Sequence, residues 1–228
     1  HLRAALGQVT APVAFTTMIA EVDAVGAFLT QSQRPRFSVL HFLGHGAWDE
    51  SRTQGYLVFE DLAGDHHGLA PVSVRAALNP NNLKEPEFRV AVLSACHSEH
   101  MLPAMMALGI RHVIAVEGDQ SVYMLAAEAF FQRFYQALLS GATVQEAFDG
   151  GRNAVFLSNK LRQLGEAVPR IEAAKFKLLP AAENHDERLV SGAPETAIPV
   201  TLPRLPQPPR PFFDPPKQLI GRQADLRK

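Results

Sequence analysis

The residue pair with the clearest chemical potential is His45 and Cys96. Cys96 is the only cysteine of the 228-residue chain, and His45 lies about 50 residues before it. A thiol attacks a carbonyl only as the thiolate, and a neighbouring imidazole can accept its proton and later protonate a leaving amine. If the fold brings the two side chains together, they provide the nucleophile and the base for cleaving a peptide bond.

Small residues beside both side chains suit the same reaction. Peptide cleavage needs hydrogen-bond donors for the oxyanion of the tetrahedral intermediate. Gly46 lets a substrate carbonyl approach the backbone and offers its N–H, and the N–H of Cys96 is a second donor. We therefore expect Gly46 and Cys96 to form the oxyanion hole. Ser94 and Ala95 are small enough to let the chain turn sharply before the nucleophile.

The segments before His45 and Cys96 are both predicted to be buried strands. Phe37 to Leu43 and Arg89 to Leu93 are nearly continuous apolar runs, which are typical of parallel strands covered on both faces. In α/β proteins the loops beyond the carboxyl ends of such strands carry function. If the two strands are neighbours, His45 and Cys96 emerge at the same edge of the sheet.

The remaining apolar periodicity predicts an α/β fold. Further strands are expected at residues 12–19, 55–59, 112–116 and 175–179, and helices at 21–30, 71–78, 102–108, 121–139 and 143–159. Alternating strands and helices imply a mainly parallel sheet with helices on its faces. Gly141 separates the last two helices, where a helix end favours a residue that tolerates positive φ. Residues 60–68, with His66 and His67, are expected to form a polar turn.

Composition divides the chain into a folded region and a proline-rich end. Residues 1–190 are expected to form one domain. Nine of the 17 prolines fall between residues 194 and 216, which predicts an extended linker over 191–217. The net charge of −1 argues against direct binding of nucleic acid. No apolar run is long enough to span a membrane, and a single cysteine fits a reducing cytoplasm.

Several blocks in order resemble the CHAT family, which comprises caspase-like proteases related to caspases and separases. The blocks are residues 39–46 (Val-Leu-His-Phe-Leu-Gly-His-Gly), 92–98 (Val-Leu-Ser-Ala-Cys-His-Ser), 109–116, 129–141 and 146–154. The resemblance covers roughly residues 10 to 180. It implies a caspase-hemoglobinase-like three-layer sandwich, with His45 as base and Cys96 as nucleophile.

One position departs from the family pattern. Glu99 stands three residues after Cys96, where the family often has glycine. Its charge would oppose thiolate formation, or select a basic P1 residue as in separase-like relatives, or simply be an exposed loop charge. Glu117 and Asp119 are the other acidic candidates for a P1 pocket. They could instead favour the N-terminus of the next helix.

A metal site is the competing interpretation of the histidines. The possible ligands are Cys96, His97 and His100, with His41 and His45. We expect no metal and no cofactor, because a second cysteine pair is missing and the strand-end position suits catalysis better. His41 is expected to be buried in its strand with a hydrogen-bond partner. Trp48 would line a substrate cleft or close a core, and Asp49 or Glu50 could orient His45.

The end of the chain has a second, shorter resemblance. Residues 219–226 (Leu-Ile-Gly-Arg-Gln-Ala-Asp-Leu) are similar to the start of AAA-like and STAND-type ATPase domains, so 218–228 would begin such a module. The expected function is a cysteine endopeptidase effector that cleaves a partner protein, controlled by this ATPase or a sensor, in antiphage defence or regulated cell death. The alternative is a catalytically silent scaffold. A nucleotide-binding domain is disfavoured because no Gly-x-Gly-x-x-Gly follows the first strand.

Overall fold

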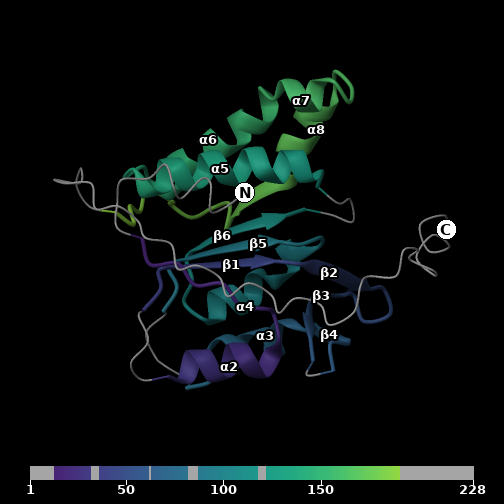
Figure 1. Ribbon diagram of the computed structural model, residues 1–228, viewed down its shortest axis with the longest axis vertical. Coiled ribbons are helices and arrows are strands. Elements are labelled where there is room, and N and C mark those ends of the chain that lie inside the picture. The colour runs from purple at the N-terminus through teal and green to yellow at the C-terminus, as the bar shows by residue number, and fades with distance from the viewer. Residues whose placement is uncertain (1–12, 32–35, 62, 82–86, 118–121, 191–228) are drawn as a thin grey trace, which may run out of the picture.

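A four-stranded sheet forms the centre of the computed structural model, which describes residues 13–31, 36–61, 63–81, 87–117 and 122–190 (Figure 1). Its strands are β1 (Val39–Leu43), β5 (Val90–Ser94), β6 (His112–Val116) and β7 (Phe176–Leu179), in the order β1-β5-β6-β7. The first three are parallel, and β7 is antiparallel to β6. The sheet is therefore mainly parallel, as predicted.

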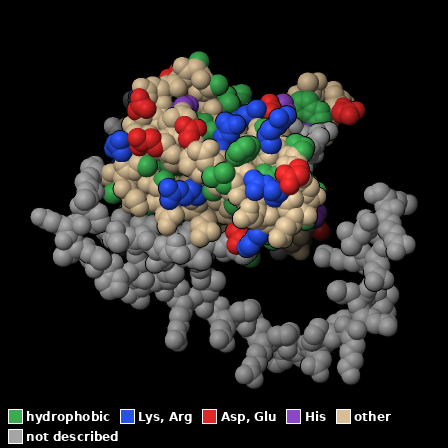
Figure 2. All heavy atoms as spheres, turned by 90° about the horizontal axis from the view of Figure 1, so that it is seen from above, with side chains coloured by type: hydrophobic (Ala, Val, Ile, Leu, Met, Phe, Trp, Pro, Cys, Tyr) green, Lys and Arg blue, Asp and Glu red, His purple; other side chains and the backbone are tan. Residues whose placement is uncertain are grey.

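Helices cover both faces of this sheet (Figure 1). On one face lie α5 (Met124–Leu139), α6 (Val144–Phe156), α7 (Asn159–Arg162) and α8 (Val168–Lys175). On the other lie α2 (Val22–Thr30), α3 (Pro71–Leu78) and α4 (Leu102–Ala107). This arrangement confirms the expected three-layer α/β sandwich. From the side of α5 to α8, basic and acidic side chains are interspersed, so neither charge dominates that face (Figure 2).

β5 is apolar from Val90 to Leu93 because both of its faces are buried. Val90 and Val92 pack into the core cluster that includes α5, α6 and β7. Ala91 and Leu93 point to the opposite cluster, with α2, α3 and α4. Alternate side chains of a strand point to opposite faces, so a strand between two helical layers has no polar side. The continuous apolar run that predicted β5 follows from this position.

A second sheet of three antiparallel strands adjoins the first. It contains β2 (His45–Asp49), β3 (Gln54–Glu60) and β4 (His66–Leu69). The chain passes from β1 directly into β2 through Gly44. The prediction missed β2, and it was wrong to place His66 and His67 in a turn, since both pair with β3. The strand expected at 12–19 is also wrong, because residues 13–19 have no regular structure.

Local signals explain the two long helices. Gly141 has φ 90°, the conformation expected of the residue between them. Thr143 and Glu146 form a capping box at the start of α6. The helix predicted at 143–159 is in fact two helices, because α6 ends at Phe156 and Ser158 caps the short α7.

A polar network attaches the last described segment to the amino ends of β5 and β6, at the end of the sheet away from His45. His112 Nε2 lies 2.8 Å from the Glu187 carboxylate, which also accepts from Arg89. His112 Nδ1 is 2.7 Å from His185 Nδ1, and His185 Nε2 donates to the Pro180 carbonyl at 3.0 Å. Burial lowers the pKa of His185 below its ordinary value. The network holds residues 180–190 against β5 and β6.

Two predictions fall outside the described residues. The proline-rich linker at 191–217 and the ATPase-like segment at 218–228 both lie there. In the part of the chain that the structure describes, no helix is both long and apolar enough to cross a membrane.

Candidate active site

The two strands that precede His45 and Cys96 are neighbours. β1 and β5 pair in parallel with Leu43 opposite Ser94, and the Gly44 N–H donates to the Ser94 carbonyl at 3.3 Å. His45 and Cys96 follow these two positions by the same number of residues. The prediction that both emerge at one edge of the sheet is confirmed.

Gly46 brings the two loops into direct contact. A Cβ placed on Gly46 would lie 1.7 Å from the Cys96 carbonyl oxygen and 3.3 Å from the Cys96 nitrogen. No side chain fits in that space, so glycine is required for steric reasons. The backbone atoms of Gly46 and Cys96, the two predicted oxyanion donors, are therefore close neighbours.

The side chains of the pair are accessible. His45 is exposed at the start of β2, opposite Val58 of β3, and Cys96 is half-buried. Among the described residues, no hydrogen bond involves either side chain. Catalytic hydrogen bonds are often long before substrate binds, so accessible side chains on touching loops remain compatible with a base and a nucleophile.

Ser98 holds the loop that carries Cys96. Its buried hydroxyl donates to the Leu93 carbonyl at 2.8 Å and accepts from the Val116 N–H at 2.9 Å. His97 adopts a left-handed conformation, with φ 55°, and turns the chain from β5 into a 3-10 helix, η1 (Ser98–Met101). Cys96 is thus presented at a sharp turn that is tied to two central strands. The sequence contained no clear signal for this role of Ser98.

The acidic P1 candidates have different environments. Glu99 Oε1 lies 3.5 Å from His100 Nε2, and the Glu99 side chain is 21% exposed. Glu117 follows β6 at the same edge of the sheet, and its carboxylate forms an ion pair with Lys177 at 2.7 Å. Asp119 lies outside the described residues.

A comparison with protein-family models finds the CHAT domain over residues 3–194. The chain belongs to the CHAT domain family. The match covers both strand ends described above, and it agrees with a caspase-like fold built on a mostly parallel sheet between helices. A comparison with curated proteins found no match.

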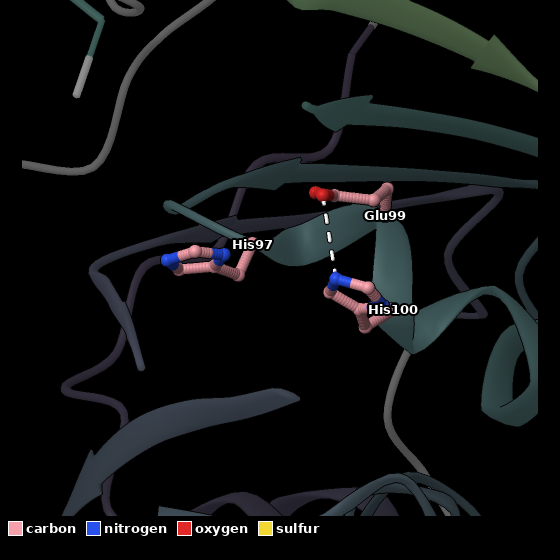
Figure 3. Close-up of side chains that lie close together, drawn as sticks. All are labelled: His97, Glu99 and His100. Carbon is pink, nitrogen blue, oxygen red and sulfur yellow. Dashed lines mark ion pairs between the residues drawn. The ribbon is translucent and has the colours of Figure 1, made fainter. Parts of the chain in front are cut away.

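Three residues of the CHAT domain after Cys96 form a compact cluster (Figure 3). Ligand atoms of His97, Glu99 and His100 all lie within 4.8 Å of one another. Trp48 packs on this cluster, with its ring 4.3 Å from that of His100 and 6.0 Å from that of His97. The ligand set considered from the sequence is thus only partly brought together: His97 and His100 meet, and Glu99 joins them.

Other side chains near the loops have structural roles. His41 lies half-buried under α5, where Nδ1 is 3.0 Å from the Tyr135 hydroxyl, so the expected hydrogen-bond partner is confirmed. Burial lowers the pKa of His41 to about 4. Asp49, a candidate for orienting His45, instead accepts from the backbone and the hydroxyl of Ser51 at 2.9 and 2.6 Å.

Proposed function

We propose that this CHAT domain is a cysteine endopeptidase with Cys96 as nucleophile and His45 as general base. The observation that carries the proposal is the contact of Gly46 with the Cys96 backbone, next to paired strand ends. It supports a site in which a base, a nucleophile and two backbone N–H donors surround one substrate carbonyl. The accessible side chains of both residues and the family membership support the same conclusion.

The reaction would follow four steps. His45 takes the proton of the Cys96 thiol, and the thiolate sulfur bonds to the substrate carbonyl carbon. The oxyanion accepts hydrogen bonds from the N–H groups of Gly46 and Cys96. The C–N bond breaks as the imidazolium of His45 gives its proton to the leaving amine, which leaves a thioester. Water, deprotonated by His45, then hydrolyses the thioester and regenerates the thiol.

Acidic residues support a preference for a basic P1 residue. The Glu99 carboxylate is on the turn that begins at Cys96, and Asp119 would follow the neighbouring strand. Glu117, whose carboxylate forms an ion pair with Lys177, is the third candidate for this pocket. A Lys or Arg side chain of the substrate would pair with these acidic groups.

The wider role proposed for the domain is that of a regulated effector. It would cleave a partner protein in a reducing cytoplasm, where its single thiol stays reduced. An ATPase or sensor module joined through residues 191–217 would control it, in antiphage defence or regulated cell death. The resemblance of residues 219–226 to ATPase domains motivates this part of the proposal.

Labelling with peptidyl electrophiles tests the proposed activity. The 228-residue chain is treated with acyloxymethyl ketone peptides that carry Arg, Asp or Ala at P1, and modified residues are mapped by mass spectrometry. We expect modification of Cys96 with the Arg probe fastest, and none in the Cys96→Ala and His45→Ala variants. The exposed His67 of β4 provides the control variant His67→Ala, which should label normally. Absence of labelling in the native chain would favour the catalytically silent scaffold.

A further inference from the structure

The cluster of His97, Glu99 and His100 has the composition of a metal site. Two imidazoles and one carboxylate lie close together on a single turn of the chain, and the Glu99 carboxylate faces the His100 ring (Figure 3). Glu99 Oε1 and His100 Nε2 are 3.5 Å apart. Ligands at about 2.0–2.2 Å from a tetrahedral ion lie about 3.4 Å apart, so this pair has the required spacing.

Against the expectation drawn from the sequence, we propose that His97, Glu99 and His100 bind a divalent transition-metal ion of the Zn²⁺ class. The three ligand atoms lie within 4.8 Å of one another, so closure around one ion needs side-chain shifts of about 1 Å. Imidazole nitrogen suits Zn²⁺ and its neighbours, whereas Mg²⁺ and Ca²⁺ prefer sites made of oxygen. Three protein ligands leave the fourth position of a tetrahedral ion open to water or to a further ligand.

The surrounding structure holds two of the ligands in place. Ser98, between His97 and Glu99, is tied by its hydroxyl to β5 and β6. A Cβ on Gly55 of β3 would lie 2.8 Å from the Cβ of His100, so the backbone of β3 packs directly against the turn. The Trp48 ring packs against His100 at 4.3 Å. A turn restrained on several sides loses little conformational freedom when an ion binds, which favours affinity.

A metal ion bound at this site would also lower the reactivity of the Cys96 thiol. Cys96 directly precedes the ligand His97, so a bound ion would lie on the same turn of the chain as the thiol. We therefore expect bound Zn²⁺ to slow the reaction of Cys96 with alkylating agents. This second effect would make the ion an inhibitor under the proposed function, but binding of the ion does not depend on peptidase activity.

Zn²⁺ titration by calorimetry tests the site in the 228-residue chain. The Cys96→Ser variant serves as background, so that the thiol itself cannot account for binding. We expect one ion per chain, and at least about 10-fold weaker binding in each of His97→Gln, Glu99→Gln and His100→Gln. The double variant His66→Gln/His67→Gln, on exposed positions of β4, should bind as tightly as the background.

Two further measurements keep the outcome clear. Zn²⁺ should raise the melting temperature of the Cys96→Ser background but not that of the ligand variants, whose circular dichroism reports on folding. In chains that keep Cys96, Zn²⁺ should slow alkylation with iodoacetamide in the native chain and not in His100→Gln. Equal affinity in the background and the three ligand variants would overturn the site. A chain that binds Zn²⁺ at this cluster but never labels with peptidyl probes would support the site and refute the peptidase.

Discussion

Replacing Gly46 by alanine tests whether the two loops must touch. The added methyl carbon would lie 1.7 Å from the Cys96 carbonyl oxygen and 2.8 Å from its carbonyl carbon. Real Cβ atoms stay at least 3.0 Å from such neighbours, so the two segments must separate by about 1.3 Å. The pairing of Leu43 with Ser94 resists this movement, because both strand ends belong to the same sheet.

The expected loss can be worked out from this displacement. A misplacement of about 1 Å between catalytic groups costs about 100-fold in rate. At about 1.4 kcal/mol per factor of ten, this corresponds to about 2.8 kcal/mol of transition-state stabilisation. Overpacking should also lower the free energy of unfolding by about 1–3 kcal/mol. Gly46→Ala therefore reacts about 100-fold more slowly with a peptidyl probe while the protein still folds.

The assay compares two reagents on the same thiol. The peptidyl probe reacts only when the Gly46 and Cys96 segments are correctly positioned, whereas iodoacetamide needs only an accessible thiolate. Gly46→Ala should therefore slow the reaction of Cys96 mainly with the peptidyl probe. Gly26→Ala is the matched control, because nothing lies within 4 Å of a Cβ at that position in α2. Its unfolding free energy should rise by about 0.5–1 kcal/mol with no change in labelling. A folded Gly46→Ala chain that labels at the native rate would refute the reasoning.

Three further outcomes are expected. His41 has a pKa of about 4 in the folded protein against an ordinary 6.5, so as the pH falls the unfolded chain binds the proton first. About 3 kcal/mol of the free energy of unfolding is therefore lost between pH 7 and pH 4. Urea unfolding of His41→Phe should lack this loss, and the same pH dependence in the variant as in the native chain would contradict the prediction. Ser98→Ala leaves the buried Val116 N–H without its partner and should lower the free energy of unfolding by about 1–3 kcal/mol, measured by denaturant titration, and an unchanged value would argue against the anchoring role. Glu187→Gln weakens the network with His112, so amide exchange of residues 180–190 should speed up while that of β5 does not; equal protection would mean that other contacts hold the segment.

The elements that could be predicted are those whose signal is local. Pro71–Leu78 and His112–Val116 have the predicted bounds, because one carries a helix start with proline and the other is a run buried on both faces. β2 was missed because His-Gly-Ala-Trp-Asp has little strand character of its own and becomes a strand by pairing with β3. The strand expected at residues 12–19 failed for the converse reason. Residues 13–19 are apolar and β-branched, but they pair with no strand in the described part of the chain.

The sequence by itself determined which side chains could react and that both follow buried strands, since residue type and apolar runs are local properties. Only the tertiary structure decided that β1 lies beside β5, so that Gly46 meets the backbone of Cys96. It also separated the histidines: His41 went under α5, while His97 and His100 met Glu99 beside Trp48. These groupings depend on the register of strands and the packing of layers, which bring together residues far apart in the chain.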